Sequence, residues 1–89
     1  MSDRNCRVFQ CGIVSQEHWF TDNKENLPGN KALGAAANVA KRMGVHGVRV
    51  INMDTQTIEF EWNRERGVTF PQEDSAATRW FNSQVTPWK

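Results

Sequence analysis

Two glycines stand five residues apart in the stretch "GNKALGAA", and this is the spacing of a phosphate-binding loop. Such a loop needs Lys and then Ser or Thr directly after its second glycine, because these side chains hold the phosphate and a magnesium ion. Ala35 and Ala36 occupy those two positions, and no G-x-G-x-x-G fingerprint is present. We therefore expect no nucleotide or other cofactor. Gly29 is interpreted as the break before a helix. Gly34 is interpreted as a position within that helix where a neighbouring element approaches its backbone closely.

Four side chains could ligate a metal ion as His or Cys: Cys6, Cys11, His18 and His46. Their spacing matches no zinc motif such as C-x-x-C. Cys6 and Cys11 are an odd number of residues apart, so on one strand their thiols would point to opposite faces. A disulfide between them would then have poor geometry. We expect reduced thiols, surface histidines and no metal.

Glu59 and Glu61 could form a carboxylate pair, and such a pair can act as general acid and base when it lies in a cleft. In "TIEFEWN", however, they alternate with Ile58, Phe60 and Trp62. This alternation predicts a strand with the apolar residues buried and the two carboxylates in water. The serines lie in no nucleophile motif. The sequence therefore predicts a protein that is not an enzyme.

Basic side chains gather in the stretch from Asn26 to Met53, which contains no Asp or Glu. They are Lys31, Lys41, Arg42 and Arg49. The first three can lie on or beside one exposed face of a helix over Asn30 to Met43, with Trp19 or Trp88 as a surface for base stacking. This pattern is typical of a nucleic-acid-binding module. The formal net charge of +1 argues against it, because it gives little attraction for a polyanion.

The stretch "GNKALGAAANVAKRMG" is similar in composition to the basic, alanine-rich helix of double-stranded-RNA-binding domains. Those domains place that helix last, after three strands. Here it precedes the main predicted hairpin, so the resemblance assigns no residue.

The elements that must position these residues follow from hydrophobic periodicity. With 89 residues the chain is expected to form a single small domain over 1–89, with a frayed segment at 1–5 and a tail at 84–89. Strands are predicted over 6–14, 47–53, 57–63 and 68–70, with a further short strand over 18–21. The expected fold is α+β: an antiparallel sheet of about four strands, one long helix packed on one face and a short C-terminal helix.

Both helices have predicted boundaries. Asn30 is expected to cap the first helix, and Gly44 to supply a left-handed C-cap. The predicted buried stripe of this helix is Leu33, Ala36, Ala37, Ala40 and Met43. Asp74 or Ser75 is expected to cap the second helix, which reaches about Ser83. Ala77, Trp80 and Phe81 would share one side of it.

The remaining function class is protein binding. Val48 and Val50 lie on one face of a predicted strand, and Ile51 and Met53 lie on the other. The sheet is therefore expected to be apolar on both faces. Either the second helix or the C-terminal tail covers the second face, or a partner or a second copy does. The principal hypothesis is a small non-enzymatic protein-binding module, with a homodimer through an apolar sheet face or edge as one form of it. The expected partner-binding residues are Glu59, Glu61, Arg64, Arg66 and Trp88.

In size and in its lack of catalytic motifs, the chain resembles the small accessory proteins of bacteriophages and mobile elements, anti-CRISPR proteins among them. This resemblance implies inhibition of a host defence protein by surface binding. No apolar run approaches a membrane span and no signal-peptide core follows Met1. We expect a soluble, cytoplasmic protein that does not bind membranes.

Overall fold

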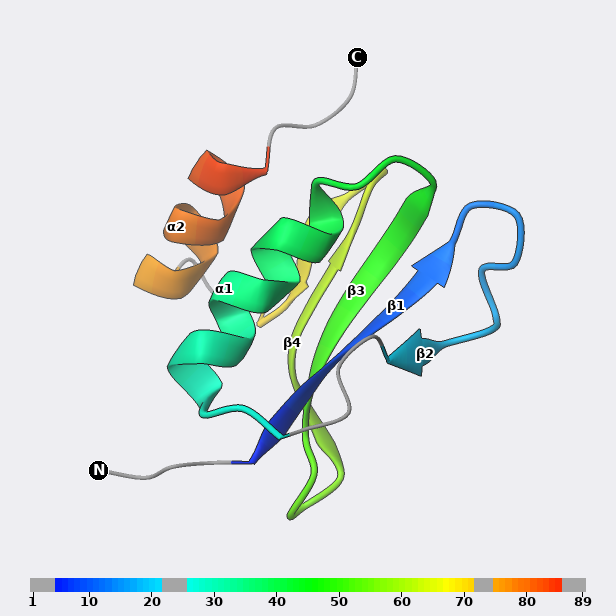
Figure 1. The fold of residues 1–89 in the computed structure, drawn as a ribbon. Coiled ribbons are helices and arrows are strands. Elements are labelled where there is room, and N and C mark those ends of the chain that lie inside the picture. Colours follow the sequence, from blue (N-terminus) through cyan, green and yellow to red (C-terminus); the bar gives the residue numbers. More distant parts are fainter. Residues whose placement is uncertain (1–4, 22–25, 72–74, 86–89) are drawn as a thin grey trace.

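The computed structural model describes residues 5–21, 26–71 and 75–85 (Figure 1). Its elements are β1 (Cys6–Gly12), β2 (Phe20–Thr21), α1 (Gly29–Ala40), β3 (Val45–Asn52), β4 (Thr57–Asn63), β5 (Gly67–Phe70) and α2 (Ala76–Gln84). The strands form one sheet in the order β2-β1-β3-β4-β5. Every neighbouring pair is antiparallel. The predicted α+β class is confirmed, and the sheet has five strands because the short β2 pairs with the edge of β1.

Both helices lie on the same face of the sheet (Figure 1). α1 packs against β1 and β3, whereas α2 lies beside α1 and β5. The Phe81 ring of α2 is 4.7 Å from the Phe60 ring and 6.2 Å from the Trp62 indole, centroid to centroid. The C-terminal helix therefore does not cover the second face. No helix within the described residues lies there, and we call it the helix-free face.

The core between sheet and helices combines valines and aromatics of the strands with small residues of α1. Val48, Phe60 and Trp62 are buried, and Phe81 is fully covered. The residues of α1 that face them are Ala32, Ala36, Ala37, Val39 and Ala40. Because these side chains are small, the helix backbone can lie close to the sheet, and Phe60, Trp62 and Phe81 supply the large apolar side chains of the core.

The predicted boundaries of α1 need correction. The helix begins at Gly29 after Pro28, and no side chain caps it, so Asn30 is not its N-cap. It ends at Ala40, three residues before the predicted end. Met43 consequently leaves the buried stripe and is 82% exposed. Gly44 does adopt the positive φ of +85° that was predicted, but in the turn that follows the helix.

Other predicted boundaries are closer. β4 spans the predicted residues, and α2 is capped by Ser75, whose side chain accepts a hydrogen bond from the Thr78 backbone N–H. β1 ends at Gly12 rather than Val14, whose side chain is fully exposed. None of the described helices is long and apolar enough to cross a membrane.

A β-bulge in β4 changes which side chains share a face. Phe60 lies opposite Val50, but Ile58 lies opposite Ile51, so Glu59 is an extra residue on its strand. Phe60 and Trp62 are buried as predicted. The prediction for Ile58 was wrong: the bulge turns it to the helix-free face, where it is 37% exposed.

Two asparagines close the hairpins at the two ends of β4. The Asn52 side-chain oxygen accepts the backbone N–H groups of Asp54 and Thr55. The Asn63 side-chain oxygen accepts those of Glu65 and Arg66. These local bonds satisfy turn N–H groups that the strands leave unpaired, so they help to set where each strand ends.

Candidate protein-binding surface

Four side chains form a connected network across the helix-free face. The Arg49 guanidinium of β3 pairs with Glu61 of β4, with 2.6 Å between Nε and Oε2. The same guanidinium lies 3.9 Å from the centroid of the Trp19 ring, which comes from the connection before β2. On the other side, the Thr69 hydroxyl of β5 donates to Glu61 Oε1 at 2.8 Å. The network thus joins the β1–β2 connection to three strands.

Trp19 can lie against the sheet because position 47 has no side chain. A Cβ atom on Gly47 would be 3.0 Å from Trp19 Cη2 and 3.2 Å from Cys11 Sγ, which is closer than ordinary contact. Cys11 is itself buried, and this burial raises the pKa of its thiol despite a backbone hydrogen bond and the nearby Arg49 charge. The Cys11 thiol is therefore a packing group, and the ring of Trp19 covers part of the face.

Glu61 is held as a carboxylate. Partial burial opposes its ionisation, but the hydrogen bonds from Arg49 and Thr69 and the Arg49 charge outweigh burial. The pKa of Glu61 therefore lies below its ordinary value. With both charges of the pair satisfied by fixed partners, the network presents a defined polar patch rather than two mobile side chains.

Apolar side chains adjoin this network. Phe9 on β1 pairs in register with Arg49, and Ile51 pairs with Ile58. Phe9 and Ile51 are half-buried, and Ile58 is exposed. The helix-free face therefore presents aromatic and aliphatic groups around a hydrogen-bonded Arg–Glu pair.

Arg64, predicted to contact a partner, is engaged within the fold. Its Nε donates to the Val45 carbonyl at 2.8 Å, and its Nη2 donates to the carbonyls of Ala40 and Arg42 at 2.9 and 3.0 Å. Its guanidinium also lies 5.2 Å from the Trp62 ring centroid. Burial lowers the pKa of Arg64. The side chain ties the β4–β5 turn to the end of α1, where helix carbonyls carry partial negative charge.

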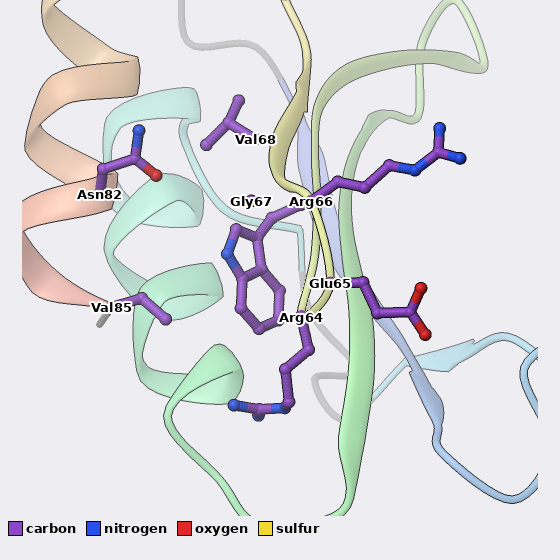
Figure 2. Close-up of a pocket in the computed structure, with 8 residues that line it drawn as sticks. Arg64, Glu65, Arg66, Gly67, Val68, Asn82 and Val85 are labelled. Carbon is purple, nitrogen blue, oxygen red and sulfur yellow. The ribbon is translucent and has the colours of Figure 1, made fainter. Parts of the chain in front are cut away.

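A hollow of about 330 Å³ lies between α2 and the β4–β5 hairpin (Figure 2). It is lined by Trp62, Arg64, Glu65, Arg66, Gly67, Val68, Asn82 and Val85. Figure 2 shows that Glu65 and Arg66 extend away from the side chains of α2 that line it. Because its charged groups do not converge, we assign it no ligand.

The other predicted partner-binding residues are dispersed. The Glu59 carboxylate accepts a hydrogen bond from Asn52 Nδ2 at 2.9 Å and lines a small hollow with Gly29 and Leu33 of α1. It therefore lies on the helix side of the sheet, not beside Glu61. Arg66 is exposed in the β4–β5 turn. Trp88 lies outside the described residues.

The predicted nucleic-acid-binding residues are not brought together. Lys31 is exposed near the start of α1, and Lys41 and Arg42 are exposed just after its end. Arg49 lies on the helix-free face, in its ion pair with Glu61. The sheet separates Arg49 from α1, near whose two ends the other three residues lie.

Sequence reasoning missed Thr69 as a member of a surface site, considered Trp19 only as a base-stacking surface, and did not include Phe9 among the predicted partner-binding residues. The alternation of β1 does place Phe9 and Cys11 on one face, so half of the signal was present. The sequence pattern did not show which face of the sheet the helices leave uncovered. In the part of the chain that the structure describes, no group of three or more His, Cys, Asp or Glu side chains could hold a metal ion.

Comparison with known proteins identifies no relative: no family model, no curated protein and no solved structure matches the chain.

Proposed function

We propose that this protein is a small protein-binding module whose contact surface is the helix-free face. One observation carries the proposal. Both helices pack on one face of the sheet, while the other presents Phe9, Ile51 and Ile58 around the network of Arg49 and Glu61. A sheet with one uncovered face of this composition gains free energy when another surface covers it.

The chemistry of the face supports a protein as the partner. Aromatic and Arg side chains dominate the binding energy of protein interfaces, and Trp19 and Arg49 supply both. The Arg49 guanidinium is fixed by its ion pair with Glu61 and by stacking on Trp19. The Trp19 ring is fixed by that stacking and by its packing against Gly47. Less side-chain entropy is then lost on binding than with mobile side chains.

As to biological role, we propose that the module acts by occupying a surface of its partner, as a small inhibitory protein of a phage or mobile element would. This role needs no catalysis, cofactor or metal. A second copy of the chain is the other occupant that the face can accept, and a symmetric pair would place Ile58 of each copy in the interface.

The test is recovery of a partner with a tagged protein and its surface variants. Wild type should retain one host protein at a fixed ratio, and Ile58→Asp should lose it, because a buried unpaired carboxylate is costly. Ala76→Asp is the control, since it places the same charge on an exposed position at the start of α2, away from the helix-free face. Sedimentation equilibrium of the purified protein detects the homodimer.

Two results would contradict the proposal. One is a partner that Ile58→Asp and wild type retain equally. The other is a chain that remains monomeric and retains no protein from lysate.

A further inference from the structure

Three connections meet at the end of the sheet where β1 finishes: residues 13–19, 41–44 and 64–66. The Ile13 backbone N–H donates to the Gly44 carbonyl at 2.9 Å, and the Arg64 backbone N–H donates to the His46 carbonyl at 2.8 Å. The Arg64 side chain adds three bonds to carbonyls of the α1–β3 region. The connections are thereby linked to one another, so the surface that they form is largely set before any partner binds.

Apolar side chains are unusually exposed at this end. Met43 is 82% exposed and Ile13 49%, and Val14 projects fully into solvent. Ile13, Met43, Gly44 and Arg64 line a hollow of about 180 Å³. Sites for whole small molecules usually measure roughly 300 Å³ or more, so this hollow suits a single apolar side chain.

Basic residues adjoin the lining of the hollow in sequence, and Arg64 is part of that lining. Lys41 and Arg42 directly precede Met43, and Arg66 is exposed in the adjoining turn. The acidic residues on the described parts of these connections are Glu17 and Glu65. With Arg64 included, this end carries four basic side chains and two acidic ones. This excess of positive charge complements an acidic partner.

We propose that this basic apolar end (Ile13, Val14, Lys41, Arg42, Met43 and Arg66) binds an acidic segment of a protein, with one apolar side chain of that segment seated between Ile13 and Met43. The hollow is concave, whereas loops that insert into lipid present a convex apolar wedge. Base stacking on nucleic acids uses exposed aromatic faces. Trp19 has the largest aromatic ring in residues 13–19, but it lies against the sheet, so this end favours a protein over a nucleic acid.

This site is distinct from the helix-free face, so it can be tested without the natural partner. The probe is a synthetic octapeptide with one central Leu flanked by Asp and Glu, titrated into ¹⁵N-labelled protein. We expect amide shifts confined to residues 13–15, 41–46 and 64–66, with a Kd below about 1 mM. Replacing the central Leu by Ala, or the acidic residues by Lys, should weaken binding about tenfold or more.

Variants then assign the contacts. Lys41→Glu/Arg42→Glu and Met43→Asp should each raise the Kd about tenfold. Lys31→Glu, at the other end of α1, is a charge-reversal control and should leave the Kd unchanged. Ile58→Asp should also leave it unchanged, so failure of this proposal and failure of the helix-free face are distinguishable.

The proposal is overturned if about 2 mM peptide causes no shifts, if the shifts lie elsewhere, or if the Ala peptide binds equally well. Tighter binding to phosphatidylserine vesicles or to a DNA duplex than to the peptide, at equal anionic charge, would overturn it in favour of a lipid surface or a nucleic acid. Because the shift map uses the wild-type protein, its outcome does not depend on how the variants fold.

Discussion

Phe60 and Ile58 stand two positions apart on β4, and a single bulge sends them to opposite sides of the sheet. Phe60 is 4% exposed and packs on Phe81, whereas Ile58 is 37% exposed. Phe60→Ala should lower the free energy of unfolding by about 3–5 kcal/mol, through lost burial and the cavity left behind. Ile58→Ala should cost about 0.5 kcal/mol.

Urea unfolding of these two variants is the measurement. Equal midpoints would contradict the assignment of the two side chains to different faces.

Glu61 makes stability depend on pH in a defined direction. Its pKa is lower in the folded state, so its contribution is present above the unfolded-state value of about 4.3 and is lost as the pH falls through the folded-state value. Glu61→Gln should therefore destabilise the protein by about 1 kcal/mol at neutral pH. The difference from wild type should shrink as the pH falls below about 4.

Urea unfolding at neutral and acidic pH tests this expectation. Glu65→Gln, exposed in the β4–β5 turn, serves as control and should change stability little at either pH. A difference between Glu61→Gln and wild type that stayed constant down to acidic pH would count against the ion pair as its source.

At the scale of elements, Arg64 joins a turn to a helix end. Arg64→Ala should lower the free energy of unfolding by about 2–3 kcal/mol, because the carbonyls of Ala40, Arg42 and Val45 lose a charged donor. Arg64→Lys should recover only part of this loss, since an ammonium group lacks the planar fork of a guanidinium.

Its neighbour Arg66 provides the control. Arg66 is exposed in the same turn, so Arg66→Ala should cost less than about 0.5 kcal/mol. Chemical denaturation of the three variants would refute this role for Arg64 if Arg64→Ala and Arg66→Ala behaved alike.

Gly34 tests the interior of α1. The sequence suggested a close approach at this glycine, but a Cβ there would meet nothing within 4 Å, so that interpretation was wrong. Gly34→Ala should stabilise the protein by about 0.5–1 kcal/mol, because glycine loses more backbone entropy in a helix. Gly47→Ala should instead destabilise it, since the new methyl group would push against Trp19 and Cys11.

Thermal melts compare the two substitutions directly. The expectation is a higher melting temperature for Gly34→Ala and a lower one for Gly47→Ala, and the reverse order would contradict both contacts.

At the scale of the whole molecule, the arrangement of charge bears on nucleic-acid binding. Arg49 is on the opposite face of the sheet from α1, and the formal net charge is +1. We expect no micromolar binding to single- or double-stranded DNA or RNA near physiological salt, and a steep loss of any weaker binding as salt rises.

A titration of fluorescent oligonucleotides decides between the two function classes. Micromolar binding that is abolished by Lys31→Glu/Arg42→Glu would replace the protein-binding proposal with the nucleic-acid one. That variant should melt like wild type, because exposed charges contribute little to stability.

Much of the secondary structure could be predicted because its signals are local. The alternation of Thr57 to Asn63 defined β4, the pair Asp74 and Ser75 marked the start of α2, and Gly44 marked a left-handed conformation just after α1. The bulge at Glu59 could not be predicted, because it depends on how β4 pairs with a neighbouring strand. The predicted partner-binding residues are dispersed because their positions also depend on contacts between elements that are distant in the sequence.

The sequence by itself determined the α+β class, the residues that share each face of β3, and the lack of a recognised catalytic motif. Only the tertiary structure decided that both helices cover one face, and that Trp19, Arg49 and Glu61 meet on the other. The physical reason is the range of the interactions. Periodicity and caps act between near neighbours, whereas the contacts of Phe81 with Phe60 and of Arg64 with Ala40 join residues more than twenty positions apart.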